Sequence, residues 1–150
     1  MARIEPDSLL QRHLSPEDGE TVVAEFRADR MTYWKGHLIM AVLLGTLAGL
    51  VLVWQGNPYP VMGPIGAAIA IAARGAFLAS EALSDAWKLT DRRLLGPGAR
   101  SIPLSQIALA RPFLGAVQIV TKSGDKHLIK YLGDAGATAQ RLRAASGAQA

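Results

Sequence analysis

The sequence predicts an α+β membrane protein, in which a hairpin of two membrane-spanning helices is joined to a small antiparallel sheet or partial barrel with a C-terminal helix. Residues 38–80 contain one formal charge, Arg74, and a short proline-rich stretch divides them into two apolar runs. Apolar runs of this length are typical of helices that cross a bilayer. From residue 86 onward, short segments that alternate between apolar and polar residues predict strands.

The overall composition limits the fold and the function classes. The chain has 150 residues, of which 50% are hydrophobic and 19% charged, and the roughly hundred residues outside the hairpin can build only one modest core. It has no cysteine, which excludes disulfides, thiolate catalysis and cysteine-based metal sites. The net charge of +4 does not indicate nucleic-acid binding, because the basic residues are scattered and several flank the apolar runs, as membrane topology requires.

Residues 1–37 are expected to form a cytoplasmic N-terminal segment. The first thirty residues are rich in charge and lack the apolar run of a cleavable signal peptide, so we expect the first apolar helix to stay in the mature protein. Asp7 or Ser8 can cap a short helix, and Gly19 marks a turn. The alternation of residues 21–28 predicts a strand before the hairpin.

Two spans are expected, at residues 38–54 and 61–80, with an external turn at residues 55–60. As a helix the first span is about 25 Å long, and an interfacial turn at residues 33–37 extends it across a hydrocarbon core of roughly 30 Å. The alternative is a helical hairpin buried in a soluble protein. It is disfavoured because so short a chain cannot cover the hairpin, and because aromatic residues collect near the ends of the apolar runs. These residues are Tyr33, Trp34, Trp54, Tyr59 and Trp87.

The flanking charges predict the orientation of the hairpin. The turn at residues 55–60 contains no Lys or Arg, whereas both outer ends of the hairpin are basic. The positive-inside rule therefore places both termini in the cytoplasm. The basic residues that flank the hairpin are Arg27, Arg30, Lys35, Lys88, Arg92 and Arg93.

Residues 81–150 are expected to form a cytoplasmic sheet domain. Strands are predicted on both sides of a turn at residues 91–92, within residues 100–113, and on both sides of a Ser-Gly-Asp turn at residues 123–125. The last pair, GAVQIVTK and KHLIKYL, is the clearest hairpin in the chain.

A helix is expected to close this domain. Asp134 can cap it, and its apolar stripe consists of small residues. The tail at residues 146–150 is expected to fray. The stripe comprises Ala135, Thr138, Leu142 and Ala145.

Two motifs follow each other in a distinctive order in this domain. WKLTDRRLL begins at Trp87, and IPLSQI begins at Ile102. Together with Gly19-Glu20 before a strand, a two-helix hairpin and a terminal helix, they resemble the bacterial pleckstrin-homology-like (PH-like) family of small membrane proteins. The likeness covers roughly residues 19–143, and the pattern Leu-Thr-x-x-Arg before Ile-Pro-Leu-x-x-Ile is moderately specific.

The resemblance implies a seven-stranded PH-like domain at a bacterial inner membrane. About five strands follow the hairpin, so the remaining material is expected either from residues 21–28 or from a bend that splits residues 100–113. It also implies a non-enzymatic protein that scaffolds a membrane protein complex, or assists its assembly, through protein contacts. The alternative is a module that binds anionic lipid head groups. The implied partners are membrane lipids and another membrane protein or a second copy.

Arg74 is the charged residue that interrupts the second apolar run. A charged side chain at mid-bilayer costs about 2.5–3.5 kcal/mol on insertion scales. Two interpretations stay open: the guanidinium snorkels to the cytoplasmic head groups, or it contacts a lipid phosphate or a carboxylate of a partner.

Small residues recur at helical spacing on both spans. Gly45 and Gly49 form a Gly-x-x-x-Gly motif, and Gly66 and Ala70 repeat the spacing on the second span. Such faces let helix backbones approach closely. They predict either packing within the hairpin or docking on another copy or a larger membrane protein.

Several basic residues are candidates for contact with anionic lipid or a partner. Each basic residue near an anionic surface contributes about 1 kcal/mol. Membrane topology and a solvated strand edge are the simpler explanations for the same charges. The candidates in the sheet domain are Lys88, Arg92, Arg93, Lys126 and Lys130.

The sequence contains no motif of a known catalytic or metal site. Its three histidines are not spaced as metal ligands, and metalloprotease, serine-hydrolase and phosphate-binding signatures are absent. The triplet at residues 122–124, Lys-Ser-Gly, is shared with serine acyl-enzymes, but a hairpin turn explains it better. We therefore expect no enzymatic activity, no cofactor and no metal.

Overall fold

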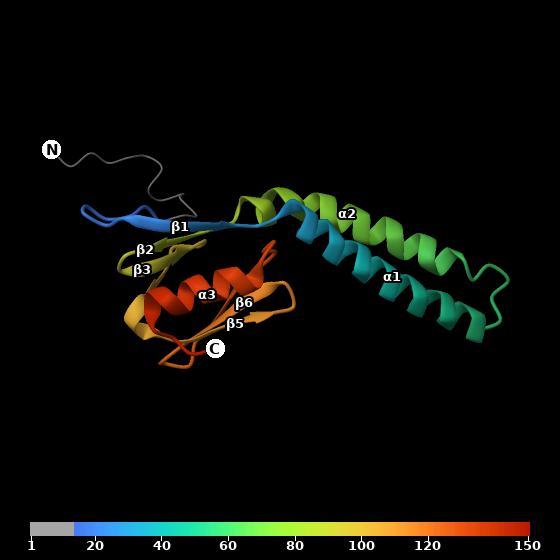
Figure 1. Ribbon diagram of the computed structural model, residues 1–150. Coiled ribbons are helices and arrows are strands. Elements are labelled where there is room, and N and C mark those ends of the chain that lie inside the picture. Colours follow the sequence, from blue (N-terminus) through green and yellow to red (C-terminus); the bar gives the residue numbers. More distant parts are fainter. Residues whose placement is uncertain (1–13) are drawn as a thin grey trace. The chain divides into compact units, whose positions relative to one another are not determined.

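The computed structural model describes residues 14–150, which form two compact units (Figure 1). One unit is Asp29–Ser84; the other combines residues 14–28 with Asp85–Ala150. The expected class is confirmed at this level: the fold is α+β, with two apolar helices that could span a membrane, two small antiparallel sheets and a C-terminal helix. The helix expected after Asp7 or Ser8 lies outside the described residues.

The helical unit consists of α1 (Arg30–Trp54) and α2 (Met62–Ser84). Asp29 caps α1, because its Oδ2 accepts hydrogen bonds from the backbone N and the hydroxyl of Thr32, both at 2.7 Å. Residues 33–37 therefore belong to the helix, which reaches about 37 Å at 1.5 Å per residue. This unit extends beyond the expected hairpin at both ends.

Glycines let the two helices pack closely. A Cβ at Gly63 would lie 2.6 Å from the backbone N of Gly49, and a Cβ at Gly45 would lie 3.1 Å from the Cα of Pro64. No larger side chain fits there without moving a backbone.

The apolar side chains of both helices point mostly outward. In each helix, only 11% of an apolar stretch of 18 residues is buried. A core helix of a soluble protein is mostly buried, so this pair is not the core of the described domain. By length and composition both helices are able to cross a membrane.

The sheet unit contains two antiparallel sheets, with strands adjacent in sequence order. The first comprises β1 (Val22–Arg27), β2 (Ala86–Thr90), β3 (Arg93–Gly96) and β4 (Arg100–Pro103). The second comprises β5 (Ile107–Phe113), β6 (Ala116–Thr121) and β7 (Lys126–Ile129).

Both expected sources of the additional strands are present. β1 pairs with β2 across the inserted helices, with Phe26 opposite Trp87. The short 3-10 helix η1 (Leu104–Gln106) separates β4 from β5, so residues 100–113 form two strands instead of one.

The sequence predicted that the aromatic residues near the ends of the apolar runs lie at the membrane interface. Two of them are instead buried. Trp87 is 4% exposed and belongs to the core of the sheet unit, where its ring covers Gly96. Tyr33 is 1% exposed within the helix pair. Trp54 and Tyr59, which flank the turn between the helices, are 86% and 67% exposed. Position near the end of an apolar run does not distinguish a core aromatic from an interfacial one.

The last helix, α3 (Ala135–Ser146), begins as expected. Asp134 Oδ1 accepts the Ala137 N–H at 2.9 Å. Its buried residues are Thr138, Ala139 and Leu142, whereas Ala145 is exposed. The strand before the helix is shorter than predicted, because Tyr131 takes a positive φ of 59° after β7.

The expectation of a frayed tail is wrong. Gly147, at φ 70°, turns the chain back toward β5 after α3. Gln149 then donates its backbone N–H to the Ala108 carbonyl and accepts the Ala110 N–H, both at 3.0 Å. Backbone pairing with β5 holds the tail.

Gly63→Ala is expected to destabilise the helix pair, because the new Cβ would lie 2.6 Å from Gly49 N. Overpacking of this kind typically costs about 1–3 kcal/mol. Gly66→Ala is the matched control, since nothing lies within 4 Å of its added Cβ. SDS titration of the full-length protein in mixed micelles, followed by circular dichroism, measures the loss of helix. An equal loss in both variants would contradict the packing described above.

Candidate interaction surfaces

An ion pair joins the segment before the hairpin to the strands after it. Nε and Nη2 of Arg93 each donate to a carboxylate oxygen of Glu20 at 3.0 Å. The Thr90 hydroxyl donates to Glu20 Oε1 at 2.6 Å. The Glu20 side chain is 1% exposed and that of Arg93 is 19% exposed. Paired, nearly parallel N–H···O bonds of this kind are among the strongest in proteins.

This network explains the Leu-Thr-x-x-Arg pattern. The Thr90 hydroxyl oxygen also accepts the backbone N–H groups of Arg92 and Arg93, at 3.2 and 3.0 Å, and so closes the turn between β2 and β3. The apolar residues of Ile-Pro-Leu-x-x-Ile have a similar structural role. Ile102, Leu104 and Ile107 all belong to the buried core. Both motifs serve the fold directly.

The same contacts change two pKa values. The hydrogen bonds from Arg93, and next those from Thr90, lower the pKa of Glu20 from its ordinary 4.5 to about 2. The hydrogen bonds to Glu20 also raise the pKa of Arg93. Glu17 lies 3.3 Å from Arg93 and adds a second negative charge. Because its charge is compensated within the fold, we leave Arg93 out of the candidate lipid or partner contacts.

The other basic candidates lie on two different sheets. Lys88 is half-buried on β2, and Arg92 is exposed in the following turn. Lys126 begins the edge strand β7 and Lys130 follows it, and both are exposed. The structure therefore does not gather the predicted basic residues into one cluster.

The predicted small residues face in two directions. Gly45 and Gly49 lie against Pro64 and pack within the hairpin. Gly66 and Ala70 are exposed, and Arg74 follows them at the same four-residue spacing, also exposed. None of the ion pairs found among residues 14–150 includes Arg74. We call these three residues, Gly66, Ala70 and Arg74, the outer stripe.

A buried histidine lies between the helices, which the sequence did not single out. His37 is 5% exposed, and its Nδ1 lies 3.0 Å from the Tyr33 carbonyl oxygen. A carbonyl oxygen only accepts, so Nδ1 is the donor in this contact. Within the part of the chain described, Nε2 has no hydrogen-bond partner. The Tyr33 hydroxyl donates to the Gly75 carbonyl at 2.8 Å and ties the helices together beside it.

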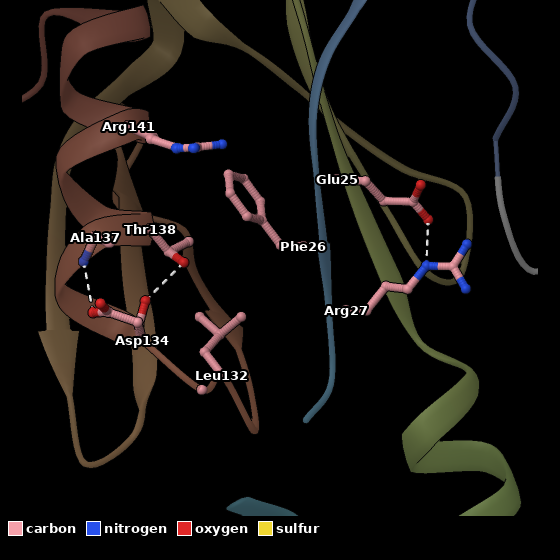
Figure 2. Close-up of a pocket in the computed structure, with 9 residues that line it drawn as sticks. Glu25, Phe26, Arg27, Leu132, Asp134, Ala137, Thr138 and Arg141 are labelled. Carbon is pink, nitrogen blue, oxygen red and sulfur yellow. Dashed lines mark hydrogen bonds and ion pairs between the residues drawn. The ribbon is translucent and has the colours of Figure 1, made fainter. Parts of the chain in front are cut away.

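A groove of about 260 Å³ lies between β1 and α3 (Figure 2). Phe26 and Arg141 point toward each other across it in Figure 2, while Glu25 and Arg27 lie on the opposite side of β1. Glu25 and Arg27 pair with each other at 2.8 Å. Glu25, Arg27 and Asp134 also belong to the lining, so residues of both charges border the groove around Phe26.

A second groove, of about 420 Å³, lies between β4 and the turn that joins β6 to β7. Its lining is mostly polar and carries both signs of charge. The Ser123 hydroxyl donates to the Asp125 carboxylate at 2.8 Å, as a turn residue does. The lining includes Arg100, Ser101, Gln106, Ser123, Asp125 and His127.

The turn between β5 and β6 carries exposed residues that were not predicted as candidates from the sequence. Leu114 and Gly115 form this turn, and Phe113 and Arg111 precede it on β5. The available signal was an apolar residue where a hairpin turn favours Asn or Asp. Residues 92–124 also contain no acidic residue.

Comparison with known proteins identified no relative. No protein-family model, curated protein or solved structure matches this chain.

Glu20→Gln is expected to lower the thermal midpoint of the sheet unit at neutral pH and to have little effect near pH 2. The lowered pKa of Glu20 means that its contribution is present above about pH 4.5 and is lost as the pH falls to about 2. Near-ultraviolet circular dichroism of both proteins across this range measures the difference. Glu17→Gln is the control, because that side chain is 73% exposed and an exposed pair contributes little. A difference that does not change with pH would contradict the assignment.

Proposed function

We propose that this chain is a non-enzymatic, membrane-anchored PH-like protein that scaffolds a membrane protein complex, or assists its assembly, through protein contacts. The observation that carries the proposal is the pairing of β1 with β2. Arg27, at the end of β1, lies opposite Ala86, at the start of β2, although the whole hairpin separates them in the chain. If both helices cross the bilayer, the two flanks therefore emerge on the same side and build one domain there.

The strand arrangement supports the PH-like assignment. Sheets of four and three antiparallel strands are followed by a terminal helix that Asp134 caps. The order agrees with the fold that the resemblance implies, and β1 supplies the strand before the hairpin.

The flanking charges support a cytoplasmic location for the domain at a bacterial inner membrane. Arg27, Arg30 and Lys35 precede or begin the first apolar run, and Lys88 follows the second. The turn at residues 55–60 has no basic residue. By the positive-inside rule this turn is external and both termini are cytoplasmic.

The outer stripe is the proposed surface for protein contacts. Gly66 and Ala70 leave the helix backbone accessible to a neighbouring helix, which is how small residues promote association in membranes. Arg74 continues the stripe and offers a charge to a carboxylate of the partner. These residues are not used by the hairpin itself, in contrast to Gly45 and Gly49.

The alternative function is binding of anionic lipid head groups by the sheet unit. One observation favours it: Lys126, which begins the edge strand β7, and Lys130, which follows it, are both exposed. Basic residues so placed attract anionic lipid.

A reporter inserted at Gly56 is expected to be periplasmic, and reporters at either terminus cytoplasmic. Alkaline phosphatase and green fluorescent protein fusions in bacteria distinguish the two sides. The same fusion after Ala150 is the internal control. A cytoplasmic reporter at Gly56 would contradict the topology.

Gly66→Ile combined with Ala70→Ile is expected to reduce the yield of crosslinked partner or dimer in membranes several-fold. The bulkier side chains block close approach along the outer stripe without entering the hairpin contact. Ala68→Ile with Ala72→Ile is the matched control, because both alanines are exposed on another side of α2. Arg74→Leu tests the charge separately. Yields that are the same in all variants would argue against protein contacts through this stripe.

A further inference from the structure

The turn between β5 and β6 exposes an apolar side chain that has no role in folding. Leu114 is 92% exposed and Phe113 is 51% exposed. Leu114 and Gly115 both have positive φ, 48° and 79°, as the two central residues of a tight hairpin turn. Such turns favour Asn-Gly, and a leucine in the left-handed region is strained. Since Leu114 buries almost nothing within the described fold, packing does not compensate for this strain.

Cationic side chains accompany this tip on the outer face of the second sheet. The strand register places Arg111 opposite Gln118, and Gln118 opposite Leu128. Side chains alternate along a strand, so Lys126 shares the side of Leu128, while the neighbouring Ile129 is buried; Lys130 directly follows the strand. Arg111, Lys126 and Lys130 are all exposed.

Lys130 lies at the same end of the sheet as the apolar tip. The backbone N–H of Leu132 donates to the Gly115 carbonyl at 3.1 Å, so the chain that follows β7 passes beside the turn. The turn between β6 and β7, at residues 122–125, lies at the opposite end of these antiparallel strands. The two ends of the sheet therefore differ in character, since only the first carries exposed Phe and Leu.

The charge of this region is strongly one-sided. Residues 107–133, the second sheet with its turns, contain four Lys or Arg residues and a single acid, Asp125. Asp125 belongs to the turn at the opposite end and receives a hydrogen bond from Ser123. An exposed apolar tip with a basic surround matches an anionic bilayer surface, where the apolar side chains enter the head-group region and the cations meet phosphates.

We propose that the β5–β6 tip, Phe113 and Leu114, inserts into the surface of an anionic lipid bilayer, with Arg111 and Lys130 contacting lipid phosphates. The inference rests on the proposed function in one respect, that the helices hold the sheet unit beside a membrane. The chain supports this, because the helical unit follows directly on Ala28 and ends directly before Asp85. The tip is a second, peripheral contact that limits how the sheet unit is oriented on its membrane.

The absence of cysteine allows a clean test in the full-length protein. Leu114→Cys is labelled with the fluorophore NBD, and the protein is reconstituted into nanodiscs of phosphatidylcholine alone or mixed equally with phosphatidylglycerol. Ser123→Cys, a nearly isosteric change at the opposite turn, carries the same label as a control. Acyl-chain nitroxide lipids quench a probe in the bilayer, and iodide quenches a probe in water.

The expected result is a blue-shifted probe at position 114 that nitroxide lipids quench and iodide does not, in discs with phosphatidylglycerol. The probe at position 123 is expected to stay in water. Arg111→Gln combined with Lys130→Gln should reduce the nitroxide quenching at position 114 several-fold.

Each contrary result identifies which idea fails. Equal aqueous exposure of both probes, in a protein that resists alkaline carbonate extraction, overturns the tip proposal alone. Protection of position 114 from iodide without nitroxide quenching means that protein covers the tip, and this also overturns it. Extraction of the chain by carbonate overturns the membrane-anchored function together with the tip proposal.

Discussion

The contact between Glu20 and Arg93, together with the pairing of β1 and β2 beside it, holds the sheet unit closed across a long insertion. The partners are 73 residues apart in the chain. Closing a long loop costs entropy that grows only slowly with its length. Two antiparallel helices reduce this cost further, because they return the chain close to its starting point. The hairpin and the ion pair therefore both support this closure.

Most of the recognisable motif residues are used by this closure. Thr90 and Arg93 hold Glu20, while Ile102, Leu104 and Ile107 fill the core. Candidate functional residues are therefore those that do not contribute to the core or to the helix contact of the described fold. Leu114 is strained and exposed, and Gly66 and Ala70 lie outside the helix contact. Arg74 is exposed beside them. These positions, rather than the motifs, are the candidates for contacts with other molecules.

The glycines of the two helices have different roles although their sequence spacing is the same. Gly45, Gly49 and Gly63 sit where a Cβ would meet the opposite backbone, whereas Gly66 meets nothing. Sequence spacing alone treats all four alike, because each has a small neighbour four residues away. Only the rotation of α2 against α1 decides which glycine is structural and which is available to a partner.

The sequence by itself determined the element types, the two apolar helices with their turn, the β2–β3 and β6–β7 turns and the cap at Asp134, because these depend on local composition and periodicity. It also identified both sources of the additional strands. Tertiary structure alone decided that Trp87 is a core residue, that Arg93 is paired, that His37 is buried and that the tail pairs with β5. Each of these depends on a contact with a residue far away in the chain, and the local sequence pattern does not identify that residue.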